Sequence, residues 1–236
     1  AEITADKSIT NSGSVFSSRA ARISAEESIH NTDKGQIGSG QKLSISSETD
    51  SITNDGIIGA VDDVLLESAK ITVNNGHILS VKAIEVNGEA LENRGQINAV
   101  KSIKLSAKDD ITNIDAGLIK SGGELTITSR EGHVKNINSD PVRFNKSGII
   151  AVDKATIDAA LGFTNNKAHI QSGKSLEILT KGSFLNDSGN MIAGELLTLR
   201  VDGDVENLNG GAIQGIKGVR IRGYNNLSTS KSLTNA

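Results

Sequence analysis

The chain contains no cysteine, a single proline and few aromatic residues, with four Phe, one Tyr and no Trp in 236 residues. The lack of cysteine excludes a disulfide framework and a thiolate metal site. The shortage of aromatic rings removes the usual platforms for stacking on bases or sugars. A net charge of -3 and a pI near 5.9 give no electrostatic reason to expect nucleic acid, whose binding proteins usually have a concentrated basic face. We therefore expect no nucleic-acid partner.

Long apolar runs are missing as well, but apolar residues recur in a fixed register with a period of about 21 residues. Each unit has a small residue as its origin and an apolar residue two positions earlier. Further apolar residues stand four and six positions after the origin, as Ile103 and Leu105 do after Ala99. A period of this length indicates a solenoid. The ten origins are Ser17, Ser39, Ala60, Ser80, Ala99, Ser121, Ala151, Ser172, Ala193 and Gly215.

The alternation of apolar and polar residues within each unit predicts short β-strands with one buried face. Successive origins are 19–22 residues apart, except for one interval of 30, and this leaves no room for crossover helices. Each strand must therefore stack on its equivalent in the next unit. We predict an all-β fold, a right-handed parallel β-helix of about ten coils of 19–22 residues that forms one domain over residues 1–236. Because both ends fall inside a unit, we also expect a fragment of a longer rod.

Most units carry Asn before the origin, followed within a few residues by Gly, as in Asn93 and Gly95. Both residue types tolerate positive φ, and Asn can hydrogen-bond the backbone locally, so the pair predicts a sharp bend between strands. Asparagines stacked from coil to coil can also form a ladder of amide hydrogen bonds. The alternative is that these asparagines bind a ligand.

The 30-residue interval between Ser121 and Ala151 contains the one break in register. Because proline cannot donate to a strand ladder, we predict that residues 136–147 leave the rod as a loop. Loops on rigid scaffolds often carry recognition, so this loop is the candidate partner contact, and a plain insertion is the alternative. The candidate contact residues are Pro141, Arg143, Phe144 and Lys146.

Acidic residues recur nine to eleven positions after the origins and predict a broken stripe along one edge. A divalent cation could bridge such carboxylates, and a solvated bend interleaved with lysine and arginine is the alternative. His77 and His169 lie four coils apart and cannot share a metal ion. We therefore predict no catalytic, metal or cofactor site. The stripe comprises Glu26, Glu27, Glu48, Asp50, Glu89, Asp109, Asp110, Glu131, Asp202 and Asp204.

The unit consensus of an apolar residue, Asn, Gly, Ile and Ala at alternate positions resembles the filamentous haemagglutinin repeats of two-partner-secreted exoproteins. It stands here as Leu91-Glu92-Asn93-Arg94-Gly95-Gln96-Ile97-Asn98-Ala99 and as Ile52-Thr53-Asn54-Asp55-Gly56-Ile57-Ile58-Gly59-Ala60. The resemblance implies a secreted or cell-surface protein of a Gram-negative bacterium, used in adhesins and in toxin delivery for contact-dependent growth inhibition. It also implies an outer-membrane transporter, recognised through a region outside this sequence.

Two functions follow. The first is a structural and interaction stalk without enzymatic activity, which presents a binding or toxic region to a receptor on a host or neighbouring cell. The second is a polysaccharide-active enzyme, because lyases and phage tailspikes also use parallel β-helices. Such an enzyme requires carboxylates or a Lys or Arg base clustered on one face, usually near aromatic residues.

Overall fold

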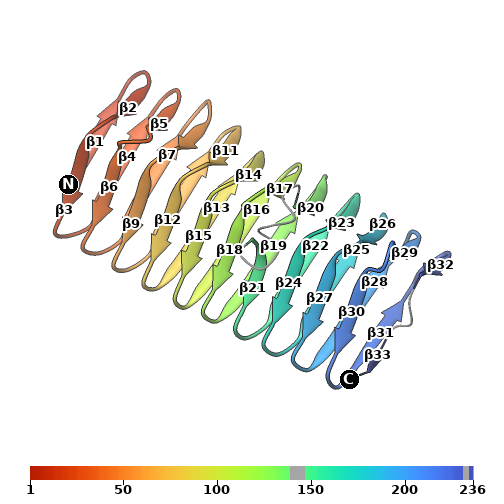
Figure 1. The fold of residues 1–236 in the computed structure, drawn as a ribbon. Coiled ribbons are helices and arrows are strands. Elements are labelled where there is room, and N and C mark those ends of the chain that lie inside the picture. Colours follow the sequence, from red (N-terminus) through yellow and green to blue (C-terminus); the bar gives the residue numbers. More distant parts are fainter. Residues whose placement is uncertain (139–146, 231–233, 236) are drawn as a thin grey trace.

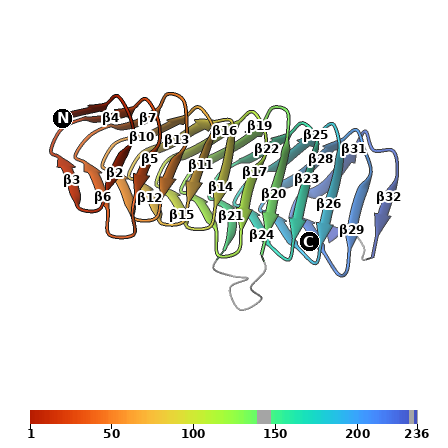
Figure 2. The same cartoon turned by 90° about the horizontal axis from the view of Figure 1, so that it is seen from above.

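The computed structural model describes residues 1–138, 147–230 and 234–235, which form three parallel sheets around a common core (Figure 1). The chain visits sheets A, B and C in turn, so each strand pairs with the strand three places later in the chain. Figure 2 shows the resulting coils stacked along one axis. With about 4.8 Å between paired strands, the ten steps give a rod about 50 Å long. The described residues include no helix that could cross a membrane.

Each sheet contains eleven strands. Sheet A consists of β1 (Glu2–Ala5), β4 (Ala21–Ala25), β7 (Leu43–Ser47), β10 (Val64–Ser68), β13 (Ala83–Gly88), β16 (Ser102–Ala107), β19 (Glu124–Ser129), β22 (Ala155–Ala159), β25 (Leu176–Thr180), β28 (Leu196–Val201) and β31 (Gly218–Arg222). Sheet B consists of β2 (Ile9–Asn11), β5 (Ile29–Asn31), β8 (Ile52–Asn54), β11 (Ile71–Asn74), β14 (Ala90–Asn93), β17 (Ile111–Ile114), β20 (His133–Ile137), β23 (Gly162–Asn166), β26 (Ser183–Asp187), β29 (Val205–Leu208) and β32 (Leu227–Thr229). Sheet C consists of β3 (Ser14–Ser17), β6 (Gln36–Ser39), β9 (Ile57–Ala60), β12 (His77–Ser80), β15 (Gln96–Ala99), β18 (Leu118–Ser121), β21 (Gly148–Ala151), β24 (His169–Ser172), β27 (Asn190–Ala193), β30 (Ala212–Gly215) and β33 (Thr234–Asn235).

The strand register confirms the predicted repeat. Origin Ala99 pairs with origin Ser121, and Ile97 pairs with Ile119 two positions earlier. Both isoleucines are fully buried, so the apolar residue of each unit enters one continuous core. Stacking in register buries this column and completes the backbone ladders at the same time, which an isolated coil could not do.

Sheet B contributes the two largest core residues. The rings of Phe163 and Phe184 stack at 5.4 Å between centroids, with 16° between their planes. In the coil that holds Phe163, Ala155 occupies the sheet A position that Leu125 and Leu176 fill in the adjoining coils. The coil therefore combines a large residue with a small one, which conserves the volume of the core.

The structure corrects the reason given for the glycines at the bends. Gly13, Gly56 and Gly95 do not have positive φ, although Gly210 does, at 80°. A Cβ atom on Gly95 would instead overlap the carbonyl oxygen of Gly76 in the preceding coil. At Gly13, in the first coil, the same position is open. Gly56 and Gly95 are needed because the backbone of the preceding coil approaches closely at the bend.

The predicted loop boundary also requires correction at its N-terminal side. Asn136 and Ile137 lie in β20 and pair with Asn165 and Asn166 of β23. The hydrogen-bond ladder therefore holds the first residues of the segment that the sequence assigns to a loop. Residues 139–146 lie outside the described part of the structure.

Candidate functional site

The asparagine ladder runs through the interior at the end of sheet B. The Nδ2 atom of Asn93 donates to Oδ1 of Asn113 at 2.7 Å and to the carbonyl oxygen of Gly95 at 3.2 Å. Nine such amide bonds, each 2.7–2.8 Å long, connect ten asparagines from Asn11 to Asn207. The ladder prediction is confirmed. The ligand-binding alternative is wrong for these residues, because nine of the ten are buried and bonded to one another.

The acidic stripe predicted from the sequence lies on the bend between sheets A and B, here called the A–B bend. All ten acids of the predicted stripe lie in it, between the end of a sheet A strand and the start of the following sheet B strand. The bend is built locally by the residue that directly follows each sheet A strand. Its backbone N–H donates to a carbonyl of the preceding coil, as Lys108 does to Gly88 and Arg130 to Ala107.

These first bend residues form a row along the rod, and their charges are segregated. The row begins with acids and then changes sign after Glu89, the residue that follows β13. Bases and acids are interleaved in the bend as a whole, as the sequence suggested, and Lys70 contacts Asp50 there. Along the first position of the bend they form separate blocks. In order, the row is Asp6, Glu26, Glu48, Ala69, Glu89, Lys108, Arg130, Ala160, Lys181 and Asp202.

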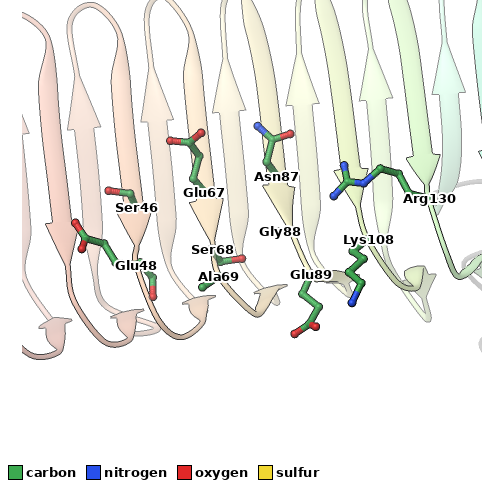
Figure 3. Close-up of a pocket in the computed structure, with 11 residues that line it drawn as sticks. Ser46, Glu48, Glu67, Ser68, Ala69, Asn87, Gly88, Glu89, Lys108 and Arg130 are labelled. Atoms are coloured by element: carbon green, nitrogen blue, oxygen red, sulfur yellow. The ribbon is translucent and has the colours of Figure 1, made fainter.

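An open groove of about 520 Å³ crosses the change of sign (Figure 3). Carboxylates on three successive coils stand at one end and two cations at the other, and the small residues Ala69 and Gly88 lie among the carboxylates. Ala69 is the only short side chain of the row between Asp6 and Arg130, so the hollow follows from its size. The charged lining residues are Glu48, Glu67, Glu89, Lys108 and Arg130, and all five are exposed.

A second hollow continues the groove toward the N-terminus. It has a volume of about 210 Å³, shares Glu48 with the first and adds Asp6 and Glu26 to its lining. The acidic end therefore extends over several coils, whereas the basic end contains two side chains. The groove could not be predicted from the sequence, because a hollow depends on which side chains stack as neighbours.

Charges beside the groove are paired. Lys70 lies 3.2 Å from Asp50, and this hydrogen bond lowers the pKa of the Asp50 carboxyl. Partial burial alone would raise the pKa of Asp110, but hydrogen bonds from Lys135, at 2.6 Å, and His133 lower it overall. These carboxylates are held ionised by their neighbours and are already neutralised.

The described residues contain no group of three His, Asp or Glu side chains placed to hold a metal ion. Four strand pairings along sheet C separate His77 from His169, as the sequence predicted. Along the acidic stripe, Asp50 and Asp110 contact lysines, and Glu131 lies 3.9 Å from Lys108. At these positions of the bend, acids and bases contact one another.

The groove is also where the enzyme alternative would have to act, because carboxylates and bases gather here. A glycosidase acid is normally a carboxyl group in a buried pocket, and sugar rings are normally held against aromatic side chains. Glu48, Glu67 and Glu89 are exposed, and the residues that line the groove include no aromatic side chain. The described lining of the groove therefore has neither the buried carboxyl group nor the aromatic ring of a usual glycosidase site.

The comparison with known families rests on the same repeat. A model described as the haemagglutinin repeat matches residues 1–50, 35–115 and 121–236. The chain belongs to the haemagglutinin repeat family. Its repeats are therefore related by sequence as well as by fold, and the β-helix is their structure in this chain.

Three curated relatives share parts of this haemagglutinin repeat chain. A "tRNA nuclease CdiA" of Escherichia coli O6:K15:H31 is 34% identical over 91 residues, 38% of this chain and 3% of the relative. A "Toxin CdiA" of Escherichia coli is 29% identical over 118 residues, 50% of this chain and 3% of the relative. A "16S rRNA endonuclease CdiA" of Enterobacter cloacae subsp. cloacae is 26% identical over 159 residues, 66% of this chain and 4% of the relative. The chain thus spans only a small part of these proteins. No solved structure matches it.

The partner-contact residues proposed from the sequence lie elsewhere in the haemagglutinin repeat chain. Pro141, Arg143, Phe144 and Lys146 fall outside the described residues, so their role stays a prediction. Deletion of this segment followed by a cell-binding measurement would test it.

Proposed function

We propose that this chain is part of the stalk of a secreted filamentous exoprotein of a Gram-negative bacterium. In this role it holds a binding or toxic region away from the cell surface. The observation that carries the proposal is the unbroken stack of coils, joined by three ladders and by the asparagine column. Such a stack can extend over a long distance although none of its residues has to contact a ligand, because each coil contacts only its neighbours.

The family supports this role. Haemagglutinin repeats match most of the chain, and the relatives carry the names of toxins and nucleases although the matched segment is 3–4% of their length. We propose an outer-membrane transporter of the two-partner-secretion type as the export partner. We further propose that the target is a receptor on a host or neighbouring cell, contacted by another part of the exoprotein.

Removal of whole coils from the full exoprotein tests the stalk. Deletion of residues 152–193 joins Ala151 to Gly194 and preserves the register of all three sheets, because Ala151 and Ala193 occupy equivalent ladder positions. We expect the shortened exoprotein to be exported, labelled by antibody on intact cells and active on target cells. Loss of target-cell binding with normal surface labelling would contradict a stalk role for these coils.

A further inference from the structure

We propose that the groove at the A–B bend binds an extended peptide segment, lying along the rod axis, that carries a basic residue and, four residues later, an acidic one. The basic residue occupies the end with Glu48, Glu67 and Glu89, and the acidic residue the end with Lys108 and Arg130. This inference does not depend on the stalk function, because it concerns the isolated chain.

Opposite charges in the groove stand on adjacent coils without pairing. On other parts of the rod several such charges do meet, as Lys104 and Glu85 do at 2.8 Å and Lys174 and Asp153 at 2.7 Å. In the groove, Glu89 and Lys108 also lie on adjacent coils. They nevertheless do not come within ion-pair distance of each other. The rod's own electrostatics leave these charges available to a ligand.

The other charged side chains of the groove are also unpaired or weakly paired. Within the described part of the chain, Glu48, Glu67, Glu89 and Arg130 form no ion pair. The one contact of Lys108, with Glu131 at 3.9 Å, is the longest ion pair between described residues. A row of unneutralised carboxylates repels itself across adjacent coils, and a bound cation would relieve that repulsion.

The spacing of the two ends of the groove matches an extended peptide. The acidic end is centred on the coil of Ala69, and the basic end lies between Lys108 and Arg130, two and a half coil steps away. At about 4.8 Å per step this distance is about 12 Å. Four residues of an extended peptide span about 13 Å, and residues i and i+4 point to the same face. One peptide can therefore place a cation and an anion into the two ends together.

Side chains of the groove would hold such a peptide. The sheet backbone is already paired from coil to coil, so the peptide cannot add as another strand, and recognition falls to side chains. The groove lining includes Ser46 and Asn87, whose polar groups suit the backbone of a peptide. Salt screens binding through charges at an exposed surface. Such charges contribute more to the selection of a ligand by its charge spacing than to its affinity.

The test uses the 236-residue chain and two capped heptapeptides of the same composition. One has the order Thr-Lys-Thr-Thr-Thr-Asp-Thr, and the other, Thr-Lys-Asp-Thr-Thr-Thr-Thr, places the charges side by side. Fluorescence anisotropy at low ionic strength measures both. We expect the spaced peptide to bind at least about tenfold more tightly, and this preference to disappear at high salt. Equal affinity of the two peptides would overturn the proposal.

Three variants locate the site. Ala69→Trp fills the hollow, and Arg130→Glu reverses its basic end. Both are changes at exposed positions, and both should abolish the preference for the spaced peptide. Ala160→Trp is the matched control, since Ala160 stands in the same row outside the groove, and it should bind like the parent. Parent-like binding by both Ala69→Trp and Arg130→Glu would show that the peptide lies elsewhere and refute the assignment. If Arg130→Glu instead binds a peptide with Lys at both positions, the orientation is established.

Discussion

The carboxamide of Asn93 lies between those of Asn74 and Asn113, accepting a hydrogen bond from the first and donating one to the second, each at 2.7 Å. All three side chains are buried. Each amide in the column therefore satisfies its neighbour while also bonding the backbone of a bend, as Asn93 does at Gly95. The column couples the shape of each bend to the stacking of the coils.

Substitution of Asn93 by Ala should strongly destabilise the rod. The Oδ1 atom of Asn113 loses its donor and the Nδ2 atom of Asn74 loses its shortest acceptor, both in the interior. We expect the free energy of unfolding in urea to fall by about 2–4 kcal/mol. Asn87→Ala, at a half-buried position on the surface, should change it by no more than about 0.5 kcal/mol. Equal effects of the two substitutions would mean that the ladder does not contribute to stability.

Two equivalent glycines should respond in opposite directions to alanine. Gly95→Ala places a methyl group against the backbone of Gly76, so we expect a loss of about 1–3 kcal/mol. Gly13→Ala meets open space and restricts the unfolded chain, so stability should be unchanged or rise by up to about 1 kcal/mol. Thermal unfolding followed by circular dichroism measures both. A similar loss at Gly13 would indicate that the bend itself, and not the neighbouring coil, requires glycine.

Deletion of one whole coil should preserve the fold, whereas deletion of half a coil should not. Removing residues 152–172 joins Ala151 to Gly173 and keeps every sheet in register. The unfolding transition should remain cooperative, with a midpoint within about 5 °C of the parent. Removing residues 152–161 brings sheet A strands against sheet B strands and should give an unfolded or aggregated chain. A well-folded product of the half-coil deletion would contradict the assigned register.

The free energy of unfolding should vary with pH in part because of Asp55. Hydrogen bonds from Asn75, at 2.7 Å, and from His30 lower the pKa of this carboxyl below its usual value of 3.8. Because the unfolded chain binds the proton more readily, the stabilisation is present above about pH 4 and is lost as the pH falls through the lower folded value. Asp55→Asn should therefore be less stable than the parent at about pH 6, and the difference should narrow by at least about half near pH 3.

Urea unfolding at both pH values measures this change. Asn75→Ala removes the strongest of the two hydrogen bonds and should give an intermediate pH dependence. A constant difference between Asp55→Asn and the parent across this range would show that the carboxylate does not couple folding to protonation.

The coil architecture could be predicted because the repeat leaves little freedom. Side chains alternate with a period of two, so a slip of one residue would turn Ile97 and its equivalents out of the core. The interval after Ser121 shows that the strand register is kept even where a coil contains extra residues. Asn136 still donates to Asn165 at 2.8 Å, although 29 sequence positions separate them. Extra residues change the length of a coil without changing the register of its strands.

The sequence by itself thus determined the stack of parallel coils, its register and its buried columns, since these follow from the spacing of apolar residues and asparagines along one chain. Only the tertiary structure decided which exposed charges become neighbours and where a hollow opens between them. Ala69 carries no signal in the sequence, and Glu89 appears there only as one acid of the stripe. Both line a groove only when coils stack, because surface contacts depend on position across coils as much as on position along the chain. The same reason applies to Gly95: position 95 requires glycine because a side chain there would overlap the backbone of the preceding coil.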